Sequence, residues 1–127
     1  MSIVPANKQD FDACQRLATA SDDEVRAHIR ELLTWLQDMN WPVAPLVARR
    51  IGTLGSSLAA PLREILRGSD DVWKYWIVSS LLPAVDGAVA ESLRAELDRI
   101  VTKPTSSEAQ EDLPGAVLRL RQKTTIQ

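Results

Sequence analysis

The chain has 127 residues, of which 45% are hydrophobic and 25% charged, a balance typical of one globular domain and not of a disordered chain. Its formal net charge of -2 lacks the positive excess of a general polyanion binder. Because the amino terminus has no basic stretch before an apolar run, and no apolar segment is long enough for a bilayer, we expect a cytoplasmic protein. Residues 1–127 should form a single domain with an ordered core of about 8–122.

Hydrophobic spacing predicts an all-α fold with about seven helices, separated by Gly, Pro, Ser and Asp. We expect these helices at about 9–19, 21–38, 42 or 43 to the Gly52–Gly55 region, 57–67, 70 or 71 to Pro83, 87–102 and 106 or 107 to Arg121. Ser21 and Glu24 form a capping box for the second helix, and Trp41, placed before a proline, should be extended. Pro114 and Gly115 should kink or split the seventh helix, and the residues through Gln127 should fray.

Each predicted helix has an apolar stripe at helical spacing. The stripes are Phe11, Cys14, Leu17 and Ala18; Val25, Ile29, Leu32, Leu33 and Leu36; Val43, Val47, Ile51 and Leu54; Leu58, Leu62, Ile65 and Leu66; and Val89, Leu93, Leu97, Ile100 and Val101. The fifth helix is apolar over most of its circumference, with Lys74, Ser79 and Ser80 as its clearly polar residues, so it should lie in the middle of a stack. The acids of the sixth helix should point outward.

Two tryptophan-rich segments lie about thirty residues apart, each at a joint between predicted helices. Leu36 aligns with Leu66 and Asn40 with Asp70 at an offset of 30, and a third unit follows from Ala90 to Leu120. Paired helices at this period predict stacked antiparallel hairpins, a HEAT-like α-solenoid. The alternative is an irregular helical bundle.

The run WLQDMNWPVA, followed by a serine-aspartate turn and WKYWI, resembles the signature of a small bacterial family of unknown function. That family is all helical and similar to HEAT-like repeats, and the likeness covers about residues 8–122. The resemblance implies a fold but no reaction. Small helical families of this kind include immunity proteins that neutralise bacterial toxins, which is an analogy of class.

The sequence is poor in groups that carry chemistry. Cys14 is the only cysteine and His28 the only histidine, so we expect a buried apolar role for the first and a helix-surface role for the second, with no metal and no cofactor. Three acidic clusters lie at predicted helix starts, where capping explains them. They are Asp22, Asp23 and Glu24; Asp70 and Asp71; and Glu108, Glu111 and Asp112. A weaker hypothesis is an enzyme that uses Asp38, Asp70 or Asp71 in a pocket at a joint, for which convergent carboxylates with raised pKa values are required.

Four arginines make the middle of the chain basic: Arg49, Arg50, Arg63 and Arg67. If the third and fourth helices are antiparallel neighbours, these side chains could converge into a patch for phosphates or for a partner's carboxylates. The alternative is that Arg50 and Arg67 complement the dipoles in the last turns of their helices and that the other two are solvated.

The tryptophans fall into two groups. Trp35, Trp73 and Trp76 lie on helical stripes and should pack in the core. Trp41 is outside a helix, and it could form an edge where a partner docks, together with Asp38, Asn40, Asp70, Asp71, Lys74 and Tyr75. In the alternative, Trp41 is a structural plug and Asp38 and Asn40 cap the third helix.

These patterns favour a non-catalytic module that binds another protein, and its most concrete form is an immunity protein that occludes a toxin. The alternative is nucleic-acid binding through the arginine face, which should weaken steeply with salt.

Overall fold

The computed structural model describes residues 2–125, and every regular element in that part of the chain is helical. The α-helices are α1 (Phe11–Thr19), α2 (Asp22–Arg26), α3 (Ile29–Leu33), α4 (Ala44–Ile51), α5 (Ala59–Arg67), α6 (Asp71–Trp76), α7 (Gly87–Ser92), α8 (Arg94–Thr102), α9 (Ser106–Gln110) and α10 (Leu113–Thr125). Short 3-10 turns cover Thr34–Leu36, Gly55–Leu58 and Leu82–Ala84, and a π-helical segment covers Ile77–Leu81. The all-α prediction is therefore confirmed.

The predicted number of about seven helices is wrong, because three of them are interrupted. The backbone leaves helical geometry at His28 (φ -121°, ψ 17°), at Leu93 (φ -101°, ψ 5°) and at Asp112 (φ 56°). The first two breaks leave the apolar spacing intact, so the sequence shows one continuous stripe on each side of them. The third lies before Pro114, which has no N–H to donate and is tolerated in the first turn of a new helix.

The cap assignments are mixed. Ser21 accepts a hydrogen bond from the Glu24 amide, as expected for the start of α2. Thr105 caps α9, in place of the predicted Ser106 or Ser107, in a complete capping box with Glu108. Helix α10 continues to Thr125, beyond the expected end, and the predicted fraying of Gln127 lies outside the described residues.

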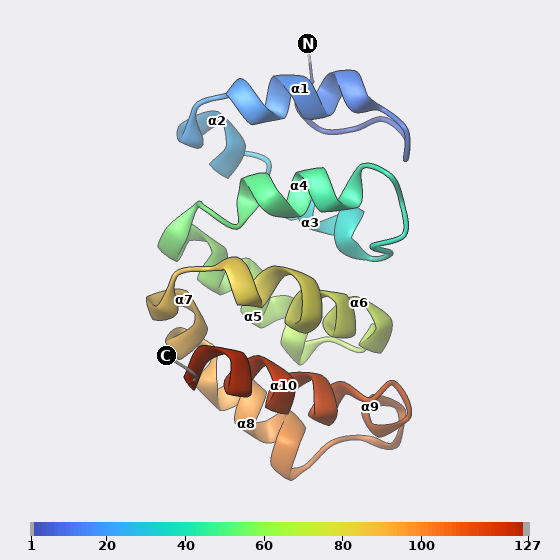
Figure 1. The fold of residues 1–127 in the computed structure, drawn as a ribbon, viewed down its shortest axis with the longest axis vertical. Coiled ribbons are helices and arrows are strands. Elements are labelled where there is room, and N and C mark those ends of the chain that lie inside the picture. The colour runs from blue at the N-terminus through green and yellow to red at the C-terminus, as the bar shows by residue number, and fades with distance from the viewer. Residues whose placement is uncertain (1, 126–127) are drawn as a thin grey trace.

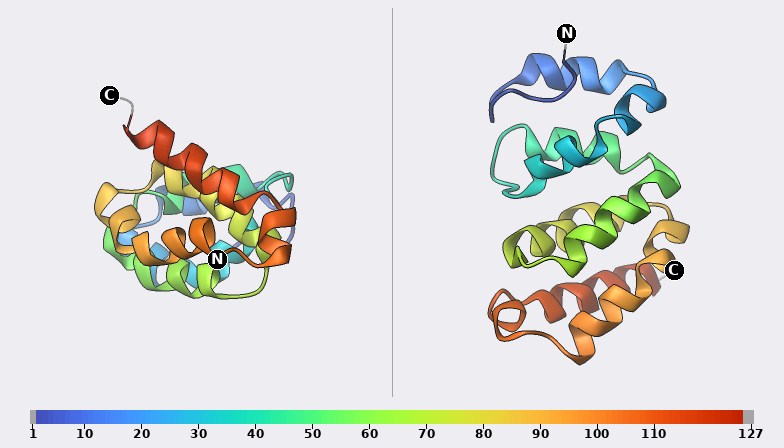
Figure 2. Two further views of the ribbon diagram at one scale, coloured as in Figure 1. Left: turned by 90° about the horizontal axis from the view of Figure 1, so that it is seen from below. Right: turned by 180° about the vertical axis from the view of Figure 1, so that it is seen from behind.

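The helices are arranged in two layers that run along the long axis of the molecule (Figures 1 and 2). We call α1, α4, α6 with its π-helical continuation, and α10 the front layer, since they face the viewer in Figure 1. We call α3, α5 and α8 the back layer; they face the viewer in the right-hand view of Figure 2. Helices α2 and α7 lie along one side of the stack, on the left in Figure 1, and α9 lies on the opposite side.

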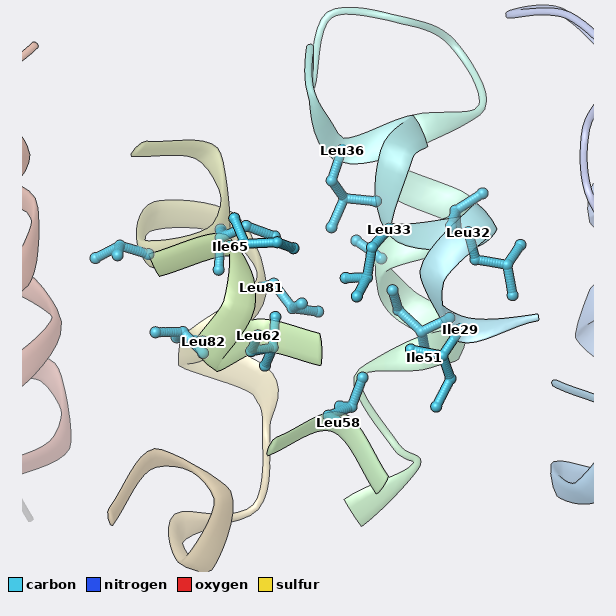
Figure 3. Close-up of a cluster of buried hydrophobic side chains, with 14 of the residues drawn as sticks. Ile29, Leu32, Leu33, Leu36, Ile51, Leu58, Leu62, Ile65, Leu81 and Leu82 are labelled. Atoms are coloured by element: carbon cyan, nitrogen blue, oxygen red, sulfur yellow. The ribbon is translucent and has the colours of Figure 1, made fainter. Parts of the chain in front are cut away.

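The core fills the space between the two layers, and Figure 3 shows its central cluster around Leu33, Leu62 and Leu81. The stripes predicted for the second, third and fourth helices are all buried, as are Val89, Leu93, Leu97 and Ile100 of the sixth. The first stripe is only half right: Cys14 and Leu17 are buried, whereas Phe11 and Ala18 are exposed. Burial of the free Cys14 thiol also raises its pKa.

Two charged residues that were expected at the surface, one at an edge where a partner docks and one pointing outward, are buried. Lys74 is only 2% exposed, and Glu96 of α8 is also buried, so not all acids of the sixth predicted helix point outward. Each has an oppositely charged partner elsewhere in the chain, Asp71 for Lys74 and Arg67 for Glu96, which stabilises a charge that burial alone would disfavour. Among residues 2–125, no helix has the length and apolar character needed to cross a membrane.

Candidate functional site

At the first tryptophan joint, the side chains bind one another. The rings of Trp35 and Trp41 meet edge to face, with centroids 5.5 Å apart and an interplanar angle of 71°. The Asp38 carboxylate accepts a hydrogen bond from the backbone N–H of Asn40 at 2.8 Å, and the backbone carbonyl of Trp41 accepts one from the backbone N–H of Ala44. Trp41 is half-buried, and its contact with Trp35 is consistent with the alternative in which Trp41 is a structural plug at the joint between α3 and α4.

Asp38 and Asn40 were predicted to cap the third helix if Trp41 is a structural plug. This cap prediction is wrong. The cap position of α4 is Val43, which offers no side-chain hydrogen bond, and the α4 end is held instead by the Val43 amide donating to the Lys8 carbonyl at 3.2 Å. At the second joint, by contrast, Asp70 does cap α6 through the Trp73 amide. The 30-residue offset therefore preserves the buried leucines but not the caps.

At the second joint, two of the predicted partner-binding residues belong to an internal charge cluster. The Lys74 Nζ lies 2.8 Å from Asp71 Oδ1, where the two groups form an ion pair without a hydrogen bond. It also donates a hydrogen bond to Glu108 Oε2 at 2.9 Å. Glu108 is 0% exposed and also accepts two hydrogen bonds from Arg99, at 2.6 and 2.7 Å. Asp71 and Lys74 are consequently not available to a partner, and the cluster fastens α9 to α6 and α8.

The charges of this cluster set the protonation of Glu108. The Arg99 guanidinium is the main cause, with help from the Thr105 amide and Lys74, and against the effect of burial these donors lower the pKa of Glu108 to about 2. The same contact raises the pKa of Arg99. A carboxylate that stays ionised and has its oxygens occupied is suited to holding helices together and not to proton transfer at neutral pH.

Three of the four predicted arginines bind acceptors of their own chain. Arg50 donates to the carbonyls of Leu17 and Ala20 and pairs with Asp22 at 2.7 Å, which fastens α4 to the chain between α1 and α2. Arg49, its neighbour, is exposed, and no side-chain hydrogen bond or ion pair joins it to the described residues.

The other two arginines converge on one buried acid of α8. Arg67 donates twice to Glu96 Oε2, at 2.9 and 3.1 Å, while Arg63 donates to the Ser92 carbonyl and lies 3.6 Å from Glu96 Oε1. These contacts hold α5 to α8 in the back layer. The four arginines do not share one site, so their placement lends no support to a single phosphate-binding patch.

The exposed apolar residues gather elsewhere. Among the described residues, the large hydrophobic side chains that remain exposed, by 37 to 49%, are Phe11, Leu46, Val72 and Leu118. They lie on α1, α4, α6 and α10, the helices of the front layer (Figure 1). None is a residue that the sequence singled out for binding. The sequence did contain a signal for two of these exposed residues, because Leu46 and Val72 are apolar residues that lie outside the buried stripes of their helices.

Two grooves accompany these residues. The first, of about 530 Å³, lies between α1 and α4 and is lined by Phe11, Leu46, Arg49 and other residues of these helices and the Thr53 turn. The second, of about 300 Å³, lies where Val72, Tyr75 and Trp76 of α6 face residues 110–112.

The second groove contains the predicted residue Tyr75, whose ring meets that of Trp76 edge to face at 5.5 Å. Trp76 was expected to pack in the core, but it lies half-buried at this groove. Trp35 and Trp73 do pack against the core, as predicted. The Trp73 indole N–H donates to the Leu33 carbonyl, which ties α6 to α3.

Comparison with known proteins assigns no reaction to this surface. A family model described as a domain of unknown function (DUF5071) matches residues 3–117. A search of curated proteins found no match.

Proposed function

The chain belongs to the DUF5071 family, and from that premise we propose that it is a non-catalytic, cytoplasmic protein-binding module, built as a HEAT-like α-solenoid. The architecture is supported by the helix pairs that follow one another along the long axis, each packed on the next (Figure 1). The binding site is the front layer.

The observation that carries the proposal is the distribution of exposed apolar side chains. Among the residues that the structure describes, the four large hydrophobic side chains that are exposed all belong to the front layer, while the back layer is crossed by ion pairs such as Arg30–Glu64 and Arg67–Glu96. Burying such residues against a partner removes apolar area from water, which is the main favourable contribution in most protein associations. A rigid surface also limits the entropy lost on binding.

The most concrete form of the proposal is an immunity protein that occludes a toxin. The enzyme hypothesis is supported less well. Of the carboxylates it names, Asp70 caps a helix and Asp71 is paired with Lys74. Nucleic-acid binding stays a prediction of the sequence, and three of its four arginines already have acceptors within the chain.

The proposal is tested by capture of protein partners with the purified, tagged chain, using extracts of its own cells and the product of the adjacent gene. We expect a partner that is retained by the wild type and by Ala95→Asp, a change on an exposed residue of back-layer α8, but lost with Leu46→Asp. A partner retained equally by all three proteins would contradict a front-layer site. Absence of any partner would contradict the function.

If the partner is a toxin, cells that express the toxin should survive only when they also express the wild-type protein or the Ala95→Asp variant. Cells that make Leu46→Asp should be poisoned, since they lack an intact docking surface. Equal survival with Leu46→Asp would argue against the immunity form.

A further inference from the structure

The two grooves of the front layer have opposite charge. The charged residues that line the groove between α1 and α4 are Arg49 and Arg50. Those that line the groove beside α6 are Glu111 and Asp112. Each groove also contains exposed apolar side chains, Phe11 and Leu46 in the first and Val72 in the second.

One charge in each groove is left for a partner. Arg50 is held by Asp22, and Asp112 by Arg119 at 3.0 Å. Arg49 and Glu111 are exposed, and within residues 2–125 neither side chain has a hydrogen bond or ion pair. The lining of the two grooves therefore offers one uncommitted cation, Arg49, and one uncommitted anion, Glu111, each beside apolar area.

From this arrangement we infer that a second copy of the chain covers the front layer, with the groove between α1 and α4 of each protomer facing the α6 groove of the other. The inference rests on the proposed front-layer site and names its occupant. A two-fold axis across the middle of the layer repeats each contact, so Arg49 meets Glu111 twice. Phe11 and Leu46 then pack near Val72 and Trp76 in both halves of the interface.

Self-association of this kind has a consequence for the proposed function. The apolar residues stay covered while the protein is alone, and another protein must displace the second copy to bind. The charges give the pairing its orientation, because a parallel arrangement would place like charges together.

The test is a charge swap at the two uncommitted residues, with the mass in solution measured by light scattering over a range of protein concentrations. The wild type should be a dimer. Arg49→Glu and Glu111→Arg should each raise the dimer dissociation constant roughly tenfold or more, because each places like charges opposite one another twice. A one-to-one mixture of the two variants should restore the dimer, since every facing pair is again of opposite sign.

Lys103→Glu, a charge reversal outside both grooves, is the matched control and should leave the dimer intact. The mixture guards against misfolding, because two damaged proteins would not rescue each other. A monomeric wild type at millimolar concentration, or variants whose mixture stays as dissociated as each alone, would overturn the inference. If Leu46→Asp still abolishes capture of another protein in that case, the proposed function survives without the dimer.

Discussion

Glu108 shows how much one buried side chain can do in this fold. Its carboxylate completes the cap of α9 and accepts hydrogen bonds from Arg99 and Lys74, so residues of three helices meet at two oxygen atoms. The sequence identified Glu108 as one of several acids at a helix start. It did not reveal the burial, because the lysine that faces it is 34 positions away.

The low pKa of Glu108 predicts a specific loss of stability in acid. The pKa is about 2 in the folded protein and near 4.5, the ordinary value of a glutamate carboxyl, when unfolded, so the stabilisation is complete above pH 4.5 and is lost as the pH falls toward 2. The full effect is about 3 kcal/mol. Urea unfolding at a series of pH values should show this loss in the wild type and a much smaller one in Glu108→Gln. Parallel pH profiles would refute it.

Removing the ammonium of Lys74 should be costly for the same reason. Lys74→Met removes the cation that contacts both of the buried carboxylates, Asp71 and Glu108, and we expect the free energy of unfolding to fall by about 3 kcal/mol. Lys103→Met, at an exposed lysine, should change it by no more than about 0.5 kcal/mol. The comparison is made by urea unfolding at neutral pH, and similar losses in both variants would mean that the cluster adds no stability.

At the scale of elements, turn geometry decides where helices begin. Gly55 has a φ of +72° at the start of the turn that leads into α5, whereas Gly87 has no such constraint and no atom within 4 Å of an added Cβ. An L-residue is strained in the first conformation and tolerated in the second.

Gly55→Ala should therefore lower the free energy of unfolding by about 1 kcal/mol, and Gly87→Ala should leave it unchanged or raise it by about 0.5 kcal/mol. Thermal unfolding of the two variants beside the wild type measures the difference. The reverse order of stabilities would contradict the turn assignment.

The helix faces could be predicted from the sequence better than the helix boundaries. Burial of Val47, Ile51 and Leu62 follows from spacing alone, since a 3.6-residue period survives a local break. The interruptions at His28 and Leu93 could not be predicted, because no proline or glycine stands there and the packing of neighbouring helices decides the geometry. The split of the seventh helix was predicted from Pro114 and Gly115 and is confirmed, but its position at Asp112 was not, because a non-glycine residue at positive φ leaves no clear sequence signal.

The candidate site was predicted less well than the fold. Sequence analysis favoured charged residues at the joints, and the structure uses most of them internally: Arg50, Arg67 and Lys74 each bind an acid or a carbonyl far away in the chain. Such pairings depend on which helices become neighbours. Exposure of Phe11 and Leu46 has the same origin, because a stripe predicts one buried face but not which apolar residues remain outside it.

At the scale of the whole molecule, the two layers have different surfaces. Ion pairs cross the back layer, and the large apolar side chains that are exposed among residues 2–125 belong to helices of the front layer. In a quasi-one-dimensional stack, each helix contacts mainly its neighbours, so a layer can keep one surface character over its whole length. The front layer is accordingly the part of the protein that should be covered when it works.

Amide hydrogen exchange tests that claim most directly. Exchange rates are compared between a dilute sample of the protein and a sample saturated with its binding partner, which can be a second copy of the chain. We predict slower exchange in α1, α4 and α6 of the bound protein, and unchanged exchange in α3, α5 and α8. Protection confined to the back layer, or no protection anywhere on saturation, would contradict the account.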